Sequence, residues 1–326
     1  MMKKAKPALI LLLKILVSVG LLVFFFTRIH IERFFNTFAS ADFSYIILAV
    51  FVYFVSQFLS ALRWKVLARP LGFDGPFKFF LNYYLIGMFF NLFAPGTVGG
   101  DVTRIYYLAR EGERNREKAW SGATMHAAVS VFVDRLVGMI VLVWLGALGL
   151  ALFPEYHIPS TVRLLTFALA LGFVLAGVLA PVLRRILSVG SHPMLVKFRV
   201  ALGTYRHDWH TIPQAIGLSF AVHLIQAWIH VIIGRAIHIE IPFSFCIIIY
   251  PLVGTFASLP ISINGFGLRE GGYLLLLTLI GINSEKSIAF GLLLFLVVAA
   301  DSLIGGVLYL LKKSPTTSAV VAETKT

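Results

Sequence analysis

The sequence predicts an all-α polytopic membrane protein, with six full spans plus two re-entrant helical hairpins arranged as an inverted repeat. Three observations lead to this fold class. Of the 326 residues, 59% are hydrophobic and 13% are charged, whereas a soluble chain carries about 25% charged residues. Long apolar runs alternate with short basic loops. A Pro/Gly break followed by an arginine also occurs twice, at corresponding places in the two halves of the chain.

Apolar segments of about twenty residues are long enough to cross a bilayer as helices. The six predicted spans are 8–28, 43–62, 119–152, 161–183, 211–234 and 287–311. The first follows a basic start and lacks an Ala-x-Ala end, so we interpret it as a retained span and not as a cleaved signal peptide. We expect one transmembrane domain over 1–313, with repeats at 8–152 and 161–311, and a disordered cytoplasmic tail at 314–326.

Two further apolar stretches, 77–103 and 243–281, are each broken in the middle. If each returns to its own side, the inside segments hold 19 Lys and Arg residues and the outside segments hold 4. Cytoplasmic loops carry the excess of basic residues, so we expect both termini in the cytoplasm of a cell membrane. The same rule predicts that 77–103 is a hairpin entering from the cytoplasm and 243–281 a hairpin entering from outside.

Both breaks combine helix-breaking residues with an arginine and an acid. The first contains Pro95, Gly96, Gly99, Gly100, Asp101 and Arg104, and the second contains Pro260, Asn264, Gly265, Gly267, Arg269 and Glu270. Proline stops a helix and glycine permits a tight turn, so backbone amides are freed there to bind an anion. Arginine pairs with phosphate through two parallel hydrogen bonds. We therefore predict an anion site at each break; a packed hairpin in which the Arg–acid pair is only a structural staple is the alternative.

The similarity of the halves extends beyond the two breaks. Matching positions are Tyr83 and Tyr250, Gly87 and Gly254, and Asp134 and Asp301. They share nearly the same offset, which favours an internal repeat with its binding site where the repeats meet. Chance alignment of apolar sequence is the alternative.

Few charges remain at membrane depth once the loops are assigned, and each costs about 2.5–3.5 kcal/mol at a helix centre. Adjacent Asp134 and Arg135 point to different faces of a helix, so each needs a partner elsewhere. We expect Asp134 to face Arg104 or Arg269. For Asp134 and its repeat mate Asp301, a structural pairing across the repeat axis explains the position as well as a role in transport does.

The remaining charges of the two breaks are expected to pair as well. Arg135 is expected to face Asp101, Glu270 or a ligand, and Asp101 is expected to hold Arg104 while no ligand is bound. Four acids, Asp101, Glu270, Asp134 and Asp301, would hold the arginines Arg104 and Arg269 while no ligand is bound, and they also offer sites for a proton.

A polar stripe lies on the span at 211–234, where His223, Gln226 and His230 share one face. The two histidines are about 10 Å apart along a helix, too far to share a metal, so we expect satisfied interior histidines. Gln57 and Ser60 are expected to line the same cavity or to make helix–helix hydrogen bonds.

Several function classes are excluded by composition and motif. The net charge of +13 lies in short loops, where membrane topology explains it better than nucleic-acid binding does. The sequence has no P-loop, no His-Glu-x-x-His, no Cys/His cluster and no nucleotide fingerprint. We expect no metal, no cofactor, no ATP-driven transport and no enzyme activity.

These motifs resemble the transmembrane, flippase-like family of lysylphosphatidylglycerol synthases and their stand-alone relatives, over about 8–311. The residues that carry the resemblance are Arg63 and Trp64, residues 91–95, Gly99, Gly100, Asp101, Arg104, Asp134, Arg135 and the stretch 260–270. The family more often has Glu at the position of Asp134 and Gly at that of Asn264. Bifunctional members continue into a soluble aminoacyl-transferase domain. This chain continues only a few residues past Lys313, so we expect no synthase activity.

The resemblance implies movement of a lipid between leaflets, and we expect a flippase or transporter of a phosphate-bearing lipid. The candidate substrate-binding residues are Arg63, Asn91, Gly99, Gly100, Asp101, Arg104, Asp134, Arg135, Asn264, Gly265, Gly267, Arg269, Glu270 and Asp301. For Arg63 with Trp64, anchoring at the membrane interface is the alternative to contact with a lipid head group.

The expected partners are membrane lipids with anionic head groups. A lipid-modifying enzyme and a second copy of the chain remain open as protein partners. Three other functions also remain open: a membrane-embedded transferase with Asp101 or Glu270 as its base, a small-solute carrier, and a partner subunit without transport activity.

Overall fold

Helices make up all the regular secondary structure in the described part of the chain. This computed structural model describes residues 16, 19–20, 23–24, 27, 30–93, 98–114, 122–186, 193–208, 210–259, 261–262 and 265–311. Five helices within these residues are long and apolar enough to cross a membrane. The chain is therefore an all-helical, multi-pass membrane protein.

The five long helices agree with five predicted spans. They are α3 (Phe43–Ala68), α6 (Ala123–Leu152), α7 (Ser160–Ile186), α9 (Thr211–Ala236) and α12 (Ser284–Leu311). Most of the predicted span 8–28 and all of the predicted disordered tail at 314–326 lie outside the described residues. α3 begins after Asp42, whose carboxylate accepts the Ser44 amide and hydroxyl at 2.9 and 2.6 Å. These two hydrogen bonds lower the pKa of the Asp42 carboxyl.

Both broken stretches form pairs of shorter helices. The first pair is α4 (Phe77–Phe93) and α5 (Val98–Arg114), and the second is α10 (Phe243–Ala257) and α11 (Leu268–Thr278). Pro95, Gly96 and Pro260 lie outside the described residues. The segment 104–118, between the stretch 77–103 and the span 119–152, was counted among the inside loops. This was wrong for its first part, since α5 continues to Arg114. Leu108 and Ala109 are buried in the core, and this packing extends the helix past the apolar stretch.

Two other segments predicted as loops also contain helices. α2 (Ile31–Ala39) packs against α12, and α8 (Pro193–Gly203) packs against α6. Short 3-10 turns follow α3 at Arg69–Leu71 and α8 at Thr204–Arg206.

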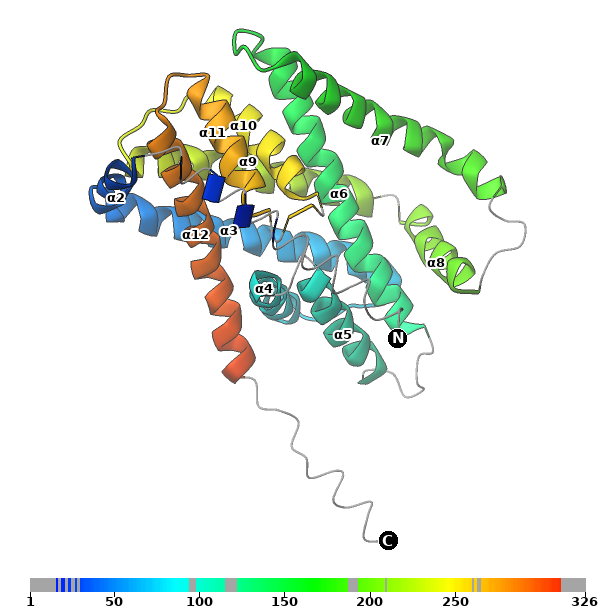
Figure 1. Cartoon of the computed structure of the whole chain (residues 1–326). Helices are drawn as coiled ribbons and strands as arrows, with labels where there is room; N and C mark the ends of the chain where they lie inside the picture. The colour runs from blue at the N-terminus through cyan, green and yellow to red at the C-terminus, as the bar shows by residue number, and fades with distance from the viewer. Residues whose placement is uncertain are drawn as a thin grey trace, which may run out of the picture.

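The two halves of the chain exchange their hairpins. α3 and α9 run side by side across the view of Figure 1, and α6 and α12 cross them. α4 of the first half packs against α12 of the second, whereas α10 of the second half packs against α6 of the first. Each hairpin therefore lies between the long helices of both halves.

Small residues permit the closest contacts within the hairpins. The Gly100 amide donates to the Asn91 side chain at 2.8 Å, and a side chain at Gly100 would collide with the carbonyl of Gly87. The turn before α11 requires positive φ at Gly265 (76°), where a Cβ would also lie 2.9 Å from Ala257. These two glycines fix how α5 and α11 lie on their hairpin partners.

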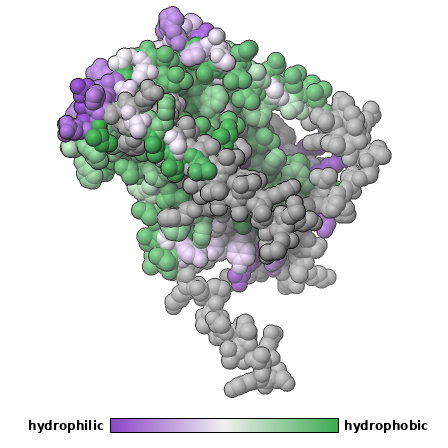
Figure 2. Space-filling model, in the orientation of Figure 1, coloured by the Kyte–Doolittle hydropathy of each residue, from purple (hydrophilic) through white to green (hydrophobic). Residues whose placement is uncertain are grey.

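Hydrophobic residues cover most of the described surface seen in Figure 2. Hydrophilic residues gather at the upper left, where Figure 1 places α2, and along the lower edge. On α7, most apolar side chains face outward, including Leu164, Leu171 and Val178. Such a surface suits contact with lipid and not with water.

Candidate functional site

A cavity of about 560 Å³ lies among the helices of both halves. Residues of α3, α4, α5, α6, α9, α10, α11 and α12 line it, so both hairpins contribute. The charged side chains in its wall are Arg63, Arg104, Asp134, Arg135 and Arg269. Its size falls within the range of about 300–1,000 Å³ that small-molecule sites occupy.

Asp134 on α6 holds two arginines from two other helices. Its carboxylate oxygens accept from Nε of Arg63 on α3 and from Nη2 of Arg104 on α5, both at 2.7 Å. All three residues are buried, with exposed fractions of 6% or less. Arg63 also donates from Nη1 to the Ser219 hydroxyl on α9 at 2.8 Å. Two guanidinium groups share one carboxylate, so the cluster carries a net charge of +1.

Arg104 also contacts two aromatic rings. Its guanidinium carbon is 4.2 Å from the ring centroid of Trp64 and 4.6 Å from that of Tyr84. The Nε atom is buried and has no hydrogen-bond partner among the described residues. Such contacts hold the guanidinium by its faces, and they do not satisfy the Nε donor at its edge.

The pairings correct several expectations. Asp101 does not hold Arg104; its carboxylate pairs with Arg135, and Arg104 is taken by Asp134. The physical reason is burial, because an ionised carboxylate as buried as Asp134 is stable only with cationic partners. Of the two partners expected for Asp134, Arg104 is present and Arg269 is not. Asp134 and Arg135 do point to different faces of α6, as predicted.

Arg63 and Trp64 do not anchor the end of α3 at an interface. Trp64 is completely buried and donates from Nε1 to Ser130 at 3.2 Å, while Arg63 lies on Asp134. The helix continues past both residues to Ala68, so they lie inside the bundle and not at its rim.

On the second hairpin, Arg269 pairs with its neighbour Glu270. The two groups are 2.9 Å apart, and Glu270 is completely buried. The second carboxylate oxygen of Glu270 accepts the Gly267 amide at 2.8 Å, which caps the start of α11. Arg269 lies 5.2 Å from the ring of Phe295 on α12. Here one acid balances one arginine, and no positive charge is left over.

Asp301, the repeat mate of Asp134, has no such arrangement. It is completely buried on α12, and neither carboxylate oxygen has a hydrogen-bond partner among the described residues. The expectation that it holds an arginine is not met in this structure, because Arg269 lies on Glu270. Its neighbour Ser302 lines the cavity.

The polar stripe on α9 is satisfied, as predicted. His223 Nε2 donates to the Gly138 carbonyl at 2.9 Å, and Nδ1 accepts from Tyr250 at 2.7 Å. His230 likewise lies between the backbone carbonyl of Gln226 and the Tyr273 hydroxyl. In both neutral rings one nitrogen donates and the other accepts. No group of three metal-ligating side chains occurs within the described ranges.

The remaining predicted residues occupy different positions. Asn91 lines the cavity, and Gly99 accepts from Thr103 at the start of α5. Asn264 lies outside the described residues. Sequence reasoning missed Tyr84, because it assigned the repeated Tyr-x3-Gly pattern to Tyr83. The adjacent tyrosine is the one that lies on Arg104.

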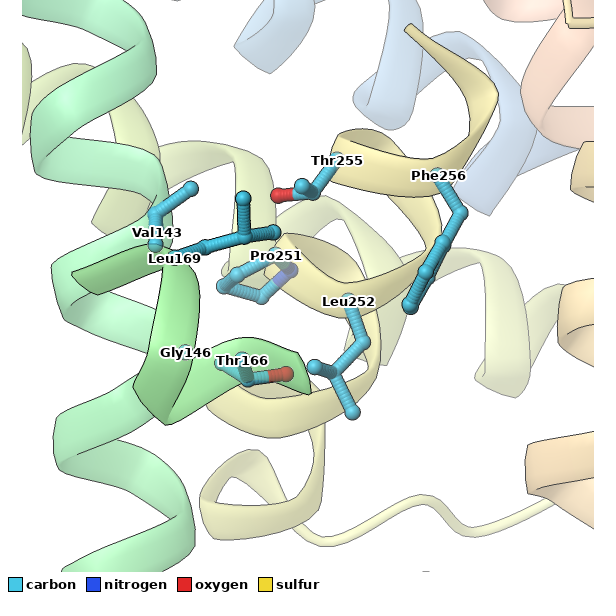
Figure 3. Close-up of a pocket in the computed structure, with 8 residues that line it drawn as sticks. All are labelled: Val143, Gly146, Thr166, Leu169, Pro251, Leu252, Thr255 and Phe256. Carbon is cyan, nitrogen blue, oxygen red and sulfur yellow. The ribbon is translucent and has the colours of Figure 1, made fainter. Parts of the chain in front are cut away.

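A second, apolar notch lies between α6, α7 and α10 and is shown in Figure 3. Its volume is about 10 Å³, which is barely room for one water molecule. Figure 3 shows Pro251 of α10 close to Gly146 of α6, where a Cβ would lie 3.0 Å from the proline ring. The notch is a gap between closely packed helices and not a ligand site.

The comparisons with known proteins agree with a membrane-embedded chain. The model of the family described as "Lysylphosphatidylglycerol synthase TM region" matches residues 11–305. The chain is 22% identical over 215 residues to the UPF0104 membrane protein MJ1595 of Methanocaldococcus jannaschii, which covers 66% of this chain and 60% of that protein. It is 24% identical over 129 residues to the UPF0104 membrane protein PH1989 of Pyrococcus horikoshii, covering 39% and 36%. The matches thus span less than two thirds of the length of either relative.

Proposed function

The chain belongs to the lysylphosphatidylglycerol synthase TM region family, and from this premise we propose that it moves a phosphate-bearing lipid between leaflets by alternating access. The lipid is a phospholipid or a polyprenyl-phosphate lipid. The two curated relatives are described only as membrane proteins, and the family name connects the fold with lipid metabolism.

The surplus positive charge in the cavity is the observation that carries this proposal. Arg63 and Arg104 share the single carboxylate of Asp134, and Nε of Arg104 has no partner among the described residues. A phosphate would supply the missing negative charge and accept from the unpaired donor. The cavity has room for a head group, and the apolar outer surface suits the acyl chains.

An inverted repeat of six spans and two re-entrant hairpins is the architecture we propose for this movement. The exchange of hairpins supports it, because α4 lies on α12 and α10 lies on α6. In transporters built from such repeats, the substrate site lies between broken helices near the middle of the bilayer. The excess of basic residues in the inside segments supports cytoplasmic termini in a cell membrane.

The alternative of a membrane-embedded transferase has less support. Its proposed bases are Asp101 and Glu270, and both are engaged by arginines. Glu270 also accepts a backbone amide with its second oxygen. Both oxygens of Glu270 are therefore engaged, whereas Oδ1 of Asp101 has no hydrogen-bond partner among the described residues.

Lipid translocation in reconstituted vesicles tests the proposal. Fluorescent phosphatidylglycerol is compared with a neutral diacylglycerol that carries the same fluorophore. We expect wild-type protein to move the phospholipid, and Arg104→Ala to lower its rate at least about tenfold, because a hydrogen bond to a charged group contributes about 1.5–3 kcal/mol. Arg104→Lys should retain part of the rate, since it keeps the charge and loses the planar donor.

Arg69→Ala is the matched control, because Arg69 is an exposed arginine outside the cavity. Folding of each variant is followed by thermal unfolding in detergent. Arg104→Ala leaves Asp134 paired with Arg63, so the variant should fold. Equal phospholipid rates in folded Arg104→Ala and wild-type protein would contradict the proposal, as would equal rates for the charged and neutral lipids.

A further inference from the structure

Asp301 stands apart from the other buried acids of the cavity region. It is completely buried in the middle of α12, and both of its carboxylate oxygens lack a partner among the described residues. Val298 and Ser302 on the same helix line the cavity, whereas Asp301 itself is buried beside that wall. An ionised carboxylate without a partner is strongly disfavoured in such a place, and a bound proton removes its charge.

The charged groups on the helices around Asp301 already have other partners. α12 packs against α2, α3, α4, α9 and α11. The titratable groups that these helices direct toward the interior are Tyr53, Arg63, Tyr84, His223, His230, Arg269, Glu270 and Tyr273. Arg63 pairs with Asp134. The histidines are satisfied by carbonyl and tyrosine groups, and Arg269 pairs with Glu270. Tyr53 lies within electrostatic range of Asp301 and cannot neutralise it. The ionisable residues of α2, Glu32 and Arg33, are exposed.

A proton suits this position better than a metal ion does. Metal cations bind several oxygen or nitrogen ligands at once. No cluster of three metal-ligating side chains is found in the described part of the chain. A proton requires only the carboxyl itself.

The first half of the chain indicates which group could neutralise Asp301 when no proton is bound. There Arg104 of α5 reaches Asp134 of α6 at 2.7 Å. Its counterpart Arg269 of α11 lies beside Phe295 on α12, which precedes Asp301 by six residues or about 9 Å of helix. Movement of α10 and α11 along α12 by one to two turns would bring Arg269 to Asp301.

We propose that Asp301 is the proton-binding site of the transporter, and that Arg269 replaces the proton when the second hairpin moves. This rests on the proposed function, and it adds that Arg269 of the second hairpin also binds the lipid phosphate. A proton on Asp301 leaves Arg269 available to the phosphate, so lipid and proton are carried together. After the proton returns to water on the other side, ionised Asp301 attracts Arg269 and the lipid is released. One proton with one monoanionic lipid is an electroneutral load.

Infrared spectroscopy of the purified protein in lipid nanodiscs tests the proton site without any transport. A protonated carboxyl has a carbonyl band that ionised carboxylates lack. We expect a band that disappears as pH rises in the wild type, that is absent in Asp301→Asn, and that is retained in Glu285→Gln. Glu285 is the matched control, since it is a buried acid on the same helix whose carboxylate accepts the His30 amide. A wild-type band that persists in Asp301→Asn, or no band at any pH, overturns the proposal.

Lipid distribution under a pH gradient tests the coupling. With one proton per lipid, a gradient of one pH unit shifts the ratio of phosphatidylglycerol between leaflets about tenfold toward the alkaline side. We expect this shift in wild-type vesicles and in Glu285→Gln, and no shift in Asp301→Asn. A wild type that moves lipid without responding to the gradient overturns the coupling while the proposed function stands. A wild type that moves no lipid overturns the proposed function, while the infrared band still decides whether Asp301 holds a proton.

Discussion

Asp134 and Asp301 occupy corresponding positions in the two halves of the chain and have opposite surroundings. Asp134 binds two arginines from two helices, whereas Asp301 has no partner among the described residues. Both carboxyls are almost completely buried, so burial does not explain the difference. The positions of the hairpin arginines explain the difference, because Arg104 pairs with Asp134 whereas Arg269 pairs with Glu270. The two halves have similar sequences, but the hairpin arginine pairs with the repeated aspartate only in the first half.

This difference has a consequence for the proposed lipid transport. If the halves alternate, this structure shows the state in which the Arg104–Asp134 ion pair joins the first hairpin to α6. The ion pair of the second hairpin, Arg269–Glu270, lies within α11 and does not join it to α12. In the opposite state the pairing would be reversed. The following predictions test this comparison, from the largest expected effect to the smallest.

Removing the charge of each aspartate should have opposite effects on stability. Asp134→Asn leaves two buried guanidinium groups without a carboxylate, and we expect it to lower the free energy of unfolding by about 3–5 kcal/mol. Asp301→Asn removes an unpaired buried acid, and we expect unchanged or higher stability at neutral pH. Thermal unfolding of both variants in the same detergent measures the difference. Similar losses in the two variants would show that the two sites are electrostatically equivalent.

The glycines that position the hairpins should be sensitive to an added methyl group. Gly100→Ala would force α5 away from α4, because the added Cβ collides with the Gly87 carbonyl. Gly265→Ala would bring a Cβ against Ala257 at a positive φ that alanine disfavours. We expect each to cost about 1–3 kcal/mol of unfolding free energy. Gly100→Ala should also lower lipid translocation more than Gly265→Ala, because it moves Arg104 away from Asp134. Both effects are measured by unfolding and by vesicle assays.

Gly172→Ala is the control for these variants, since a Cβ at this position on α7 would meet open space. It should leave both stability and translocation nearly unchanged. A loss of stability as large as that of Gly100→Ala would mean that an added methyl group destabilises the protein even in open space. The close contact at Gly100 would then not explain the loss seen there.

The aromatic contacts of the two arginines should differ modestly. Trp64 lies 4.2 Å from Arg104 and donates to Ser130, whereas Phe295 lies 5.2 Å from Arg269. We expect Trp64→Phe to cost about 1–2 kcal/mol of stability, and Phe295→Leu less than about 1 kcal/mol. Unfolding measurements on the two variants compare them. A larger loss for Phe295→Leu would mean that the second arginine is held more firmly than its geometry indicates.

Much of the fold follows from local patterns in the chain. The five long helices of the described ranges agree with predicted spans, because about twenty apolar residues form a helix in lipid whatever lies beside them. The two breaks fell where proline and glycine interrupt apolar sequence. Helices α2 and α8 and the continuation of α5 were not predicted. These are more polar segments, and their helices depend on packing against α12, α6 and the core.

The site was predicted less completely than the fold. Sequence reasoning selected both hairpin arginines and the two repeated aspartates, because charge at membrane depth is costly and therefore conspicuous. It assigned their partners less well. Arg63 was a candidate binding residue with interface anchoring as its alternative, its partner Asp134 was not predicted, and Tyr84 beside Arg104 was overlooked. Their roles depend on which helices meet, and a single sequence contains no signal for that contact.

The sequence by itself determined that this chain is an all-helical membrane protein with two broken stretches and buried charges in corresponding places. Apolar length, helix breakers and loop charge are local properties, and each acts through a few neighbouring residues. Only the tertiary structure decided that Asp134 holds Arg63 and Arg104, while Asp301 has no hydrogen-bond partner among the described residues. Ion pairs form over a few ångströms between helices far apart in sequence, so their choice depends on how the hairpins pack, and that packing differs between two halves of similar sequence.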